Sequence, residues 1–229
     1  MIKYIDGTVF NSPAKTIVNT INCVGVMGAG IALEFKLRFP EMYKNYQIRC
    51  DEDKVKIGHP YLYKVKKNKW ILNFPTKYHW RNPSKIEYIE QGLIYFRNNY
   101  QRENFESIAF PKLGTNKGGL EWDQVKPIME KYLMDLDIPV YIALNEKKEA
   151  EGIEKIMLDI INKNLENDCR DIGIGKRQKT ILLGNLPYSK LYQISNINGI
   201  GEKTYERIFK YYYHQAHNQE ENTDQLNFF

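Results

Sequence analysis

Glycine residues gather in two segments of the chain, and each segment follows an apolar run and precedes a helix-like stretch. The first covers residues 17–32, with glycines at 25, 28 and 30, and the second covers 110–122, with glycines at 114, 118 and 119. Such a turn presents free backbone N–H groups and the positive end of a helix, which together bind phosphate. Glycine also serves tight left-handed turns, so a purely structural role is the alternative. We predict that both loops bind phosphate.

The spacing of these glycines excludes the best-known nucleotide motifs. The first loop does not follow G-x-G-x-x-G, no acidic residue stands about 20 positions later to hold a ribose, and the G-K-[ST] of a P-loop is missing. The three cysteines and four histidines show no metal-ligand spacing, so neither a metal nor a cofactor is predicted. Two such loops without a metal indicate a nucleotide diphosphate held by the backbone.

The elements that must position these loops alternate between strand-like and helix-like runs. Strand-like runs occupy residues 2–5, 16–21, 61–65, 70–74, 107–110 and 140–144. Helices are predicted over 27–39, from a capping box at 84–87 onward, over 121–136 and over 148–164. This order predicts a three-layer α/β/α fold with a mixed, largely parallel sheet. Both loops then meet at the carboxyl edge of that sheet.

Composition favours a soluble, globular, cytoplasmic protein. Hydrophobic residues make up 42% and charged residues 27% of the chain, and no apolar run reaches the roughly 20 residues that cross a bilayer. No signal peptide is evident, and an odd number of widely spaced cysteines suits reduced thiols. The net charge of +5 fits a polyanionic partner, but a solvated lysine-rich surface explains it equally well.

The order of these motifs resembles the macrodomain, a fold that binds ADP-ribose. The resemblance begins with Gly7-Thr8-Val9 and the run at 14–22, continues through both loops, and covers residues 1–145 of a predicted domain at 1–165. It implies ADP-ribose binding by Thr8, Val9, Asn19, Val26, Met27, Gly28, Gly30, Ile31, Pro111, Leu113, Gly114, Thr115, Asn116, Lys117, Gly118, Gly119 and Leu120. Many macrodomains bind adenine through an Asp where Thr8 stands, so backbone and apolar contacts are expected to hold adenine here.

Two segments, 24–40 and 73–92, resemble the DarG group of macrodomains, antitoxins that remove ADP-ribose from thymine bases modified by DarT toxins. The resemblance implies that Lys77 is catalytic, as nucleophile or base, and that Asn22 holds the distal ribose. A lysine titrates near pKa ~10.4, so it needs desolvation or cationic neighbours to act near neutrality. His79 and Trp80 are expected to stack on the modified base. Without the resemblance, Lys77 reads as an ordinary surface lysine.

Three functions remain open at this point. The first is a DNA ADP-ribosyl glycohydrolase whose partners are ADP-ribose, ADP-ribosylated DNA and a DarT-type toxin. The second is a deacylase of ADP-ribosyl-glutamate on proteins, as in the human terminal ADP-ribose glycohydrolase, a more distant relative with a similar lysine. The third is a non-enzymatic reader of ADP-ribose.

A small all-helical unit is predicted at residues 181–214, after a polar, basic linker at 166–180. Residues 194–208 resemble a helix-hairpin-helix, in which Gly199, Gly201 and Lys203 contact a DNA phosphate without reading sequence. Tyr205 stands where this motif usually has Ala, which predicts looser helix packing. A plain helical hairpin is the alternative.

The C-terminal residues 215–229 are predicted to be a flexible tail. They end in Gln225-Leu226-Asn227-Phe228-Phe229, which resembles the peptides that dock on the bacterial sliding clamp. In that interpretation Gln225 makes polar contacts, while Leu226, Phe228 and Phe229 fill an apolar pocket. The alternative is that the tail packs back on its own domain.

Overall fold

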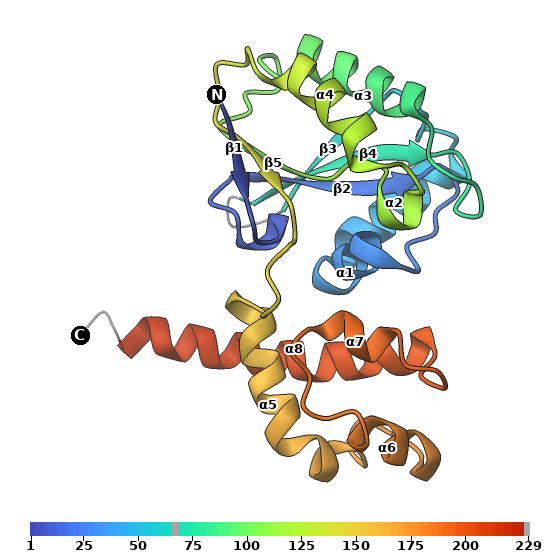
Figure 1. Ribbon diagram of the computed structural model, residues 1–229, viewed down its shortest axis with the longest axis vertical. Coiled ribbons are helices and arrows are strands. Elements are labelled where there is room, and N and C mark those ends of the chain that lie inside the picture. Colours follow the sequence, from blue (N-terminus) through green and yellow to red (C-terminus); the bar gives the residue numbers. More distant parts are fainter. Residues whose placement is uncertain (66–68, 227–229) are drawn as a thin grey trace. The chain divides into compact units, whose positions relative to one another are not determined.

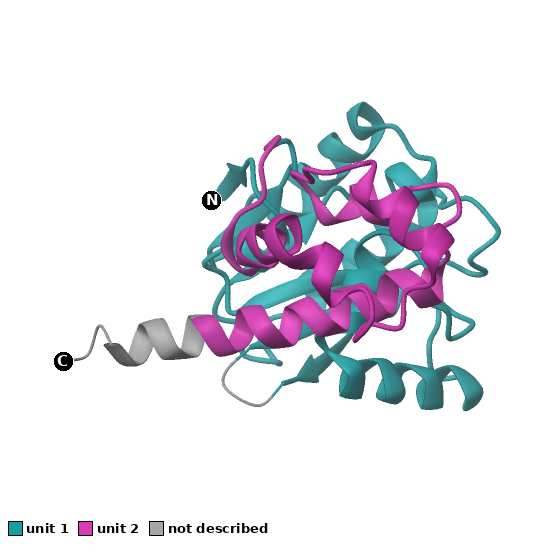
Figure 2. Cartoon of the chain, turned by 90° about the horizontal axis from the view of Figure 1, so that it is seen from below, with its two compact units in different colours: residues 1–146 teal, residues 147–229 magenta. Residues whose placement is uncertain are grey.

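The computed structural model describes residues 1–65 and 69–226, with side chains to residue 219 (Figure 1). The chain divides into two compact units, Met1–Glu146 and Lys147–Phe229, which are described separately (Figure 2). The first unit contains 21 Lys and Arg against 16 Asp and Glu, and the second contains 12 of each kind. The whole net charge of +5 therefore belongs to the first unit.

A six-stranded sheet with the order β1-β6-β5-β2-β4-β3 forms the centre of the first unit. Its strands are β1 (Ile2–Ile5), β2 (Thr16–Asn22), β3 (Tyr61–Lys64), β4 (Trp70–Lys77), β5 (Ile108–Pro111) and β6 (Val140–Ala143). Every neighbouring pair is parallel except β3 with β4. The predicted mixed, largely parallel sheet is confirmed, and the predicted strands agree with the observed ones to within a few residues.

Helices cover both faces of this sheet (Figure 1). On one face, α3 (Ile86–Asn99) and α4 (Trp122–Leu133) share an apolar cluster with Val18 of β2. On the other face, residues of α1 (Gly30–Arg38) and α2 (Pro40–Asp51) pack with Ile17 and Ile21. Alternate residues of β2 therefore enter opposite cores, as the pleat of a strand requires. The predicted α/β/α layering is confirmed.

Two details of the first unit differ from the sequence-based expectations. Pro40 ends one helix, as predicted, but it also opens α2, because a proline at the first helical position lacks only an N–H that would be unpaired there. The capping box predicted at 84–87 does not form. Lys85 is the residue before α3, and no side chain caps that helix.

The second unit consists of α5 (Gly152–Asp168), α6 (Lys176–Leu183), α7 (Leu191–Ser195) and α8 (Glu202–Leu226). It is all-helical, as predicted, but α5 belongs to it and packs against α8, so the boundary lies at residue 147 rather than 166. Within the range predicted as a linker, residues 166–168 end α5 and residues 176–180 begin α6. The buried side chains of α5, which need a partner helix, explain the difference.

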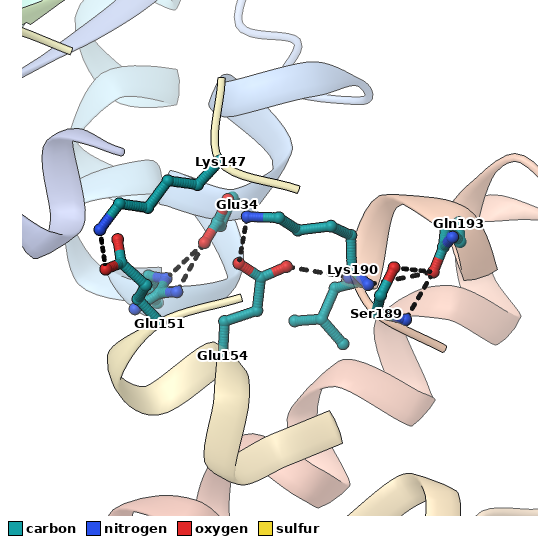
Figure 3. A network of polar contacts seen from close by, with 9 residues as sticks. Glu34, Lys147, Glu151, Glu154, Ser189, Lys190 and Gln193 are labelled. Carbon is teal, nitrogen blue, oxygen red and sulfur yellow. Dashed lines mark hydrogen bonds and ion pairs between the residues drawn. The ribbon is translucent and has the colours of Figure 1, made fainter. Parts of the chain in front are cut away.

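Polar contacts around the start of α7 fasten the second unit (Figure 3). Glu154 of α5 accepts the Leu191 N–H at 2.9 Å and lies 4.0 Å from the Lys190 ammonium. Only 14% of the Glu154 side chain and 8% of the Lys190 side chain is exposed. The Lys190 N–H donates to the Gln193 side chain at 3.0 Å, which closes the first turn of α7.

Helix α8 continues to residue 226, through most of the region predicted to be a flexible tail (215–229). It spans 25 residues and ends at Leu226, because no glycine or proline follows Gly201 to interrupt it. Phe228 and Phe229 lie outside the described residues, as do the side chains of Gln225 and Leu226. Within the described parts of the chain, no helix is both long and apolar enough to cross a membrane.

Candidate functional site

Three neighbouring strands deliver the predicted site residues to one edge of the sheet. Strand β2 lies between β4 and β5, and these strands end at Asn22, Lys77 and Pro111 respectively. A shift in register after Ile21 pairs Asn22 directly with Lys77. The two glycine loops therefore leave adjacent parallel strands, β2 and β5, and the convergence expected from the sequence is present.

The Asn22 carboxamide organises the first loop. Its Oδ1 accepts the N–H groups of Val24 at 3.0 Å and Val26 at 3.4 Å, and its Nδ2 donates to the Val26 carbonyl at 2.5 Å. The Tyr46 hydroxyl lies 2.9 Å from both the backbone and the side-chain oxygen of Asn22. Asn22 therefore shapes the loop in this structure, and its contact with the distal ribose stays a prediction. Tyr46 was not identified from the sequence.

The second loop folds tightly between β5 and α4. Its backbone has positive φ at Gly114, Asn116 and Gly119, and the Leu120 N–H donates to the Gly114 carbonyl at 3.1 Å. A single turn of 3-10 helix, Asn116–Gly118, forms its tip. A hollow of about 260 Å³ beside the loop is lined by Lys112, Thr115, Asn116, Gly119, Leu120, Glu121 and Trp122.

The two loops approach each other across the edge of the sheet. A β-carbon placed on Gly30 would lie 3.6 Å from the Lys117 Cγ, so the start of α1 is in near contact with the second loop. Gly30 itself has φ of +59°, a conformation that side chains disfavour. An anion bound at the N-terminus of α1 would therefore also be close to the tip of the second loop.

Lys77 is joined to the second loop by a direct contact. Its Nζ donates to the Lys117 carbonyl at 2.5 Å, and desolvation of the half-buried side chain lowers the pKa of its ammonium. The cations near it in sequence have other partners: Arg81 stands over the Trp80 ring at 4.5 Å and Lys85 over the Tyr88 ring at 5.5 Å. Of the two causes considered from the sequence, burial is the one that lowers this pKa.

Exposed aromatic rings follow Lys77 directly. The rings of His79 and Trp80 are stacked, with centroids 5.5 Å apart and planes 26° apart. Trp80 is 45% exposed and Tyr78 is 63% exposed. The Cys23 N–H donates to the Tyr78 carbonyl at 3.0 Å, which ties this segment to the first loop. Aromatic rings and the Arg81 guanidinium therefore directly follow Lys77 in the chain.

Some residues predicted to bind ADP-ribose have side chains in the core. Val9, Met27 and Leu113 are at most 1% exposed, and Asn19 is fully buried with its Nδ2 donating to Asn73 at 2.9 Å. Their side chains pack the sheet, so any contact with a ligand has to come from their backbone. Thr8 is half-buried before the short 3-10 helix Val9–Asn11.

The predicted hairpin of the second unit connects α7 to α8. Gly199 has φ of +93°, and both Gly201 and Lys203 are exposed at the start of α8. Tyr205 is only 7% exposed, so the unit accommodates the larger side chain at this position inside its core. No group of His, Cys, Asp and Glu among the described residues could hold a metal ion.

Comparison with known proteins agrees with this geometry. The model of the Macro domain family matches residues 18–129. The solved macrodomain of Mycobacterium tuberculosis DarG is 41% identical, with a TM-score of 0.61, and the match covers 62% of this chain and 97% of that structure. Parallel strands that carry two glycine loops to one edge, together with these matches, define a macrodomain, and the chain belongs to that family.

Within the family, the similarity is to the DarG macrodomains. A protein of Thermosipho africanus named DNA ADP-ribosyl transferase-DNA ADP-ribosyl glycohydrolase fusion protein is 37% identical over 179 residues, which are 69% of this chain and 46% of that protein. Thermosipho africanus DarTG, solved in complex with ADP-ribose, is 39% identical with a TM-score of 0.62, over 67% of this chain and 44% of that structure. The chain spans about half the length of the curated relatives it matches.

Proposed function

We propose that this protein removes ADP-ribose from ADP-ribosylated DNA, with thymine-linked ADP-ribose as its substrate. The observation that carries the proposal is the Lys77 amine, which has a lowered pKa and lies at the sheet edge where both glycine loops meet. The names of the relatives support the DNA substrate, and the complex of a relative with ADP-ribose supports the ligand.

In the proposed reaction, the neutral Lys77 amine acts at C1″ of the distal ribose. As nucleophile, its lone pair forms a C–N bond while the bond to thymine breaks, and the base leaves with a proton. Water then hydrolyses the lysine adduct, which releases ADP-ribose and the free amine. As base, the same amine would remove a proton from an attacking water. Both roles need an unprotonated amine, so a lowered pKa favours both.

The aromatic surface next to Lys77 suits an unpaired base. Stacking of bases on aromatic rings is worth roughly 1–3 kcal/mol per base. We assign the modified thymine to His79 and Trp80, whose rings already form one stacked surface. The Arg81 guanidinium on the Trp80 ring adds positive charge there, and the excess of cations lies in this same unit.

The two rival functions are separated by one comparison. A deacylase would release ADP-ribose from a glutamate ester and spare the N-glycosidic bond, whereas a reader would bind ADP-ribose and release nothing. The protein should be incubated with an ADP-ribosylated thymidine oligonucleotide and, side by side, with an ADP-ribosyl-glutamate peptide. We expect release from the oligonucleotide. Release from the peptide alone would establish the deacylase, and release from neither would establish a reader.

We also propose that the second unit contacts DNA backbone through Gly199, Gly201 and Lys203. The second unit as a whole has no net charge, so the proposal is supported by individual cations. Lys203 is exposed beside the hairpin, and Lys176 and Arg177 are exposed on α6. Lys203→Glu should reduce the salt dependence of DNA binding by about one phosphate contact. Lys163→Glu, an exposed change on α5, is the matched control. Equal slopes for both variants would make the hairpin purely structural.

The C-terminal Gln225, Leu226, Phe228 and Phe229 are proposed to bind a bacterial sliding clamp, and a DarT-type toxin is proposed as the source of the modification. Both partners, together with the free thiols of all three cysteines, support a cytoplasmic location. A synthetic peptide of the last ten residues should bind purified clamp weakly, with Kd on the order of micromolar. Leu226→Ala with Phe229→Ala should abolish that binding. A peptide that does not bind would exclude the clamp as a partner of this tail.

A further inference from the structure

Ser84 is a buried residue to which neither the fold nor the proposed chemistry has assigned a task. It precedes α3 but does not cap it, and it is only 4% exposed. Its hydroxyl has no hydrogen-bond partner among the described residues. A buried hydroxyl without a partner costs about 1–3 kcal/mol, so the contacts that the Ser84 backbone makes are of interest.

The backbone of Ser84 is fastened to the second loop. Its N–H donates to the Gly118 carbonyl at 2.8 Å. One residue earlier in the same loop, the Lys117 carbonyl accepts the Lys77 ammonium at 2.5 Å. Two consecutive carbonyls of the loop are therefore held by Lys77, the last residue of β4, and by Ser84, in the segment 78–85 that joins β4 to α3.

The hydroxyl of Ser84 occupies the space in front of Gly118. A β-carbon on Gly118 would lie 2.7 Å from the Ser84 Oγ and 3.4 Å from the Ser84 Cβ. Gly118 does not have a positive φ, so its backbone conformation is open to any residue. Among the described residues, the Ser84 hydroxyl is therefore the one group that would lie closer than ordinary van der Waals contact to a side chain at 118.

We propose that Ser84 is a positioning residue for the reaction: its N–H tethers the second loop, so that the Lys117 carbonyl meets the Lys77 amine, and its hydroxyl fills the space in which a side chain at position 118 would lie. This inference rests on the proposed role of Lys77. The Ser84 hydroxyl does not touch the reacting carbon in this scheme. Ser84 acts through its N–H, which holds the loop whose Lys117 carbonyl orients the amine.

A pair of compensating substitutions tests this role. Gly118→Ala should force the loop away from Ser84 and lower kcat about tenfold or more, because small misplacements of a catalytic group are costly. Ser84→Ala alone keeps the tethering N–H and should stay within about threefold of the wild type. The double variant Ser84→Ala/Gly118→Ala removes the clashing oxygen and should recover kcat to within about threefold of Ser84→Ala.

Two further measurements separate positioning from simple support of the fold. For Gly118→Ala, kcat should fall by a larger factor than the Kd for free ADP-ribose rises, because the loop that binds phosphate and the acceptor of the Lys77 amine both shift, and the thermal midpoint should show that the variant is folded. Unimpaired turnover in Gly118→Ala, no recovery in the double variant, or a rise in KM and Kd that matches the loss in kcat would each overturn the inference. Lys77→Ala, measured in parallel, keeps the two proposals apart: if it remains active, the proposed function itself fails.

Discussion

Replacing Lys77 by alanine gives the most direct test of how this site works. The change removes the amine that lies 2.5 Å from the Lys117 carbonyl and leaves both glycine loops in place. We expect release of ADP-ribose from a modified thymidine oligonucleotide to fall by at least ~100-fold, the lower range for loss of a proton-transfer group, which corresponds to about 2.7 kcal/mol of transition-state stabilisation.

Binding of free ADP-ribose should change far less in the same variant. The substitution removes one charge-assisted hydrogen bond between a half-exposed side chain and the loop, and this bond is worth no more than about 1 kcal/mol after solvent screening. That value limits the loss of affinity to roughly fivefold. The loss of turnover, measured by single-turnover kinetics, should therefore exceed the loss of affinity, measured by calorimetry, by more than a factor of ten.

Lys69 provides a matched control for this experiment. It is also a lysine whose pKa is lowered by burial, and its Nζ also donates to a backbone carbonyl, that of Ala14 at 3.0 Å. It stands just before β4, at the opposite end of the strand from Lys77. Lys69→Ala should leave turnover unchanged. If both variants lost activity to the same extent, or if Lys77→Ala stayed within a few-fold of the wild type, the catalytic assignment would be refuted.

Three other predictions rest on the described contacts. The kcat of the wild type should rise with pH around a midpoint below the ordinary lysine pKa of ~10.4, because burial disfavours the Lys77 ammonium and the neutral amine is the active form; a midpoint at or above that value would contradict this. Tyr46→Phe should lower the free energy of unfolding by about 1 kcal/mol and weaken ADP-ribose binding, because Asn22 loses a hydrogen-bond partner; calorimetry and denaturant titration would show both effects. Glu154→Ala should lower the free energy of unfolding of the second unit by about 3 kcal/mol, because it leaves the nearly buried Lys190 ammonium without this carboxylate. Activity on a short oligonucleotide should stay unchanged. A loss of stability below about 1 kcal/mol, the value of an exposed ion pair, would contradict the stabilising role of the buried pair.

The sequence predicted the strands and the convergence of the loops because both depend on local patterns. The apolar run of β2 and the glycines after it indicate a strand followed by a turn wherever they occur. The same holds for β5, and parallel strands have to end at one edge of the sheet. The resemblance that runs through residues 1–145, both loops included, identified the family.

The contacts within the site could not be predicted in the same way. The hydrogen bond from Lys77 to the Lys117 carbonyl joins residues 40 positions apart through a main-chain atom, which no residue type reveals. Ser84 matched a capping pattern, but in the structure its N–H donates to the Gly118 carbonyl of the second loop, and Ser84 does not cap α3. Asn19 and Met27 lie in a motif that suggests ligand contact, yet their side chains are buried in the core, and their contact with ADP-ribose stays a prediction.

The division of the chain was misplaced for a related reason. The polar and glycine-containing stretch near residue 170 has the composition of a linker, whereas the true boundary lies in a short charged segment before α5. The turn between α5 and α6 is polar and contains glycine, as a linker does, but it buries Cys169, Ile172 and Ile174 in the second unit.

The length of α8 has a mechanical consequence. Its 25 residues form a rod of about 37 Å, at 1.5 Å per residue, with the hairpin at one end and Gln225 and Leu226, the first two residues of the C-terminal peptide, at the other. A flexible tether lets its two ends sample many separations, and its effective concentration falls gradually with length. A rod instead fixes one separation and one direction. Partners bound at the two ends of α8 would therefore be kept at a fixed distance. The insertion of helical residues would rotate one partner relative to the other by about 100° per residue.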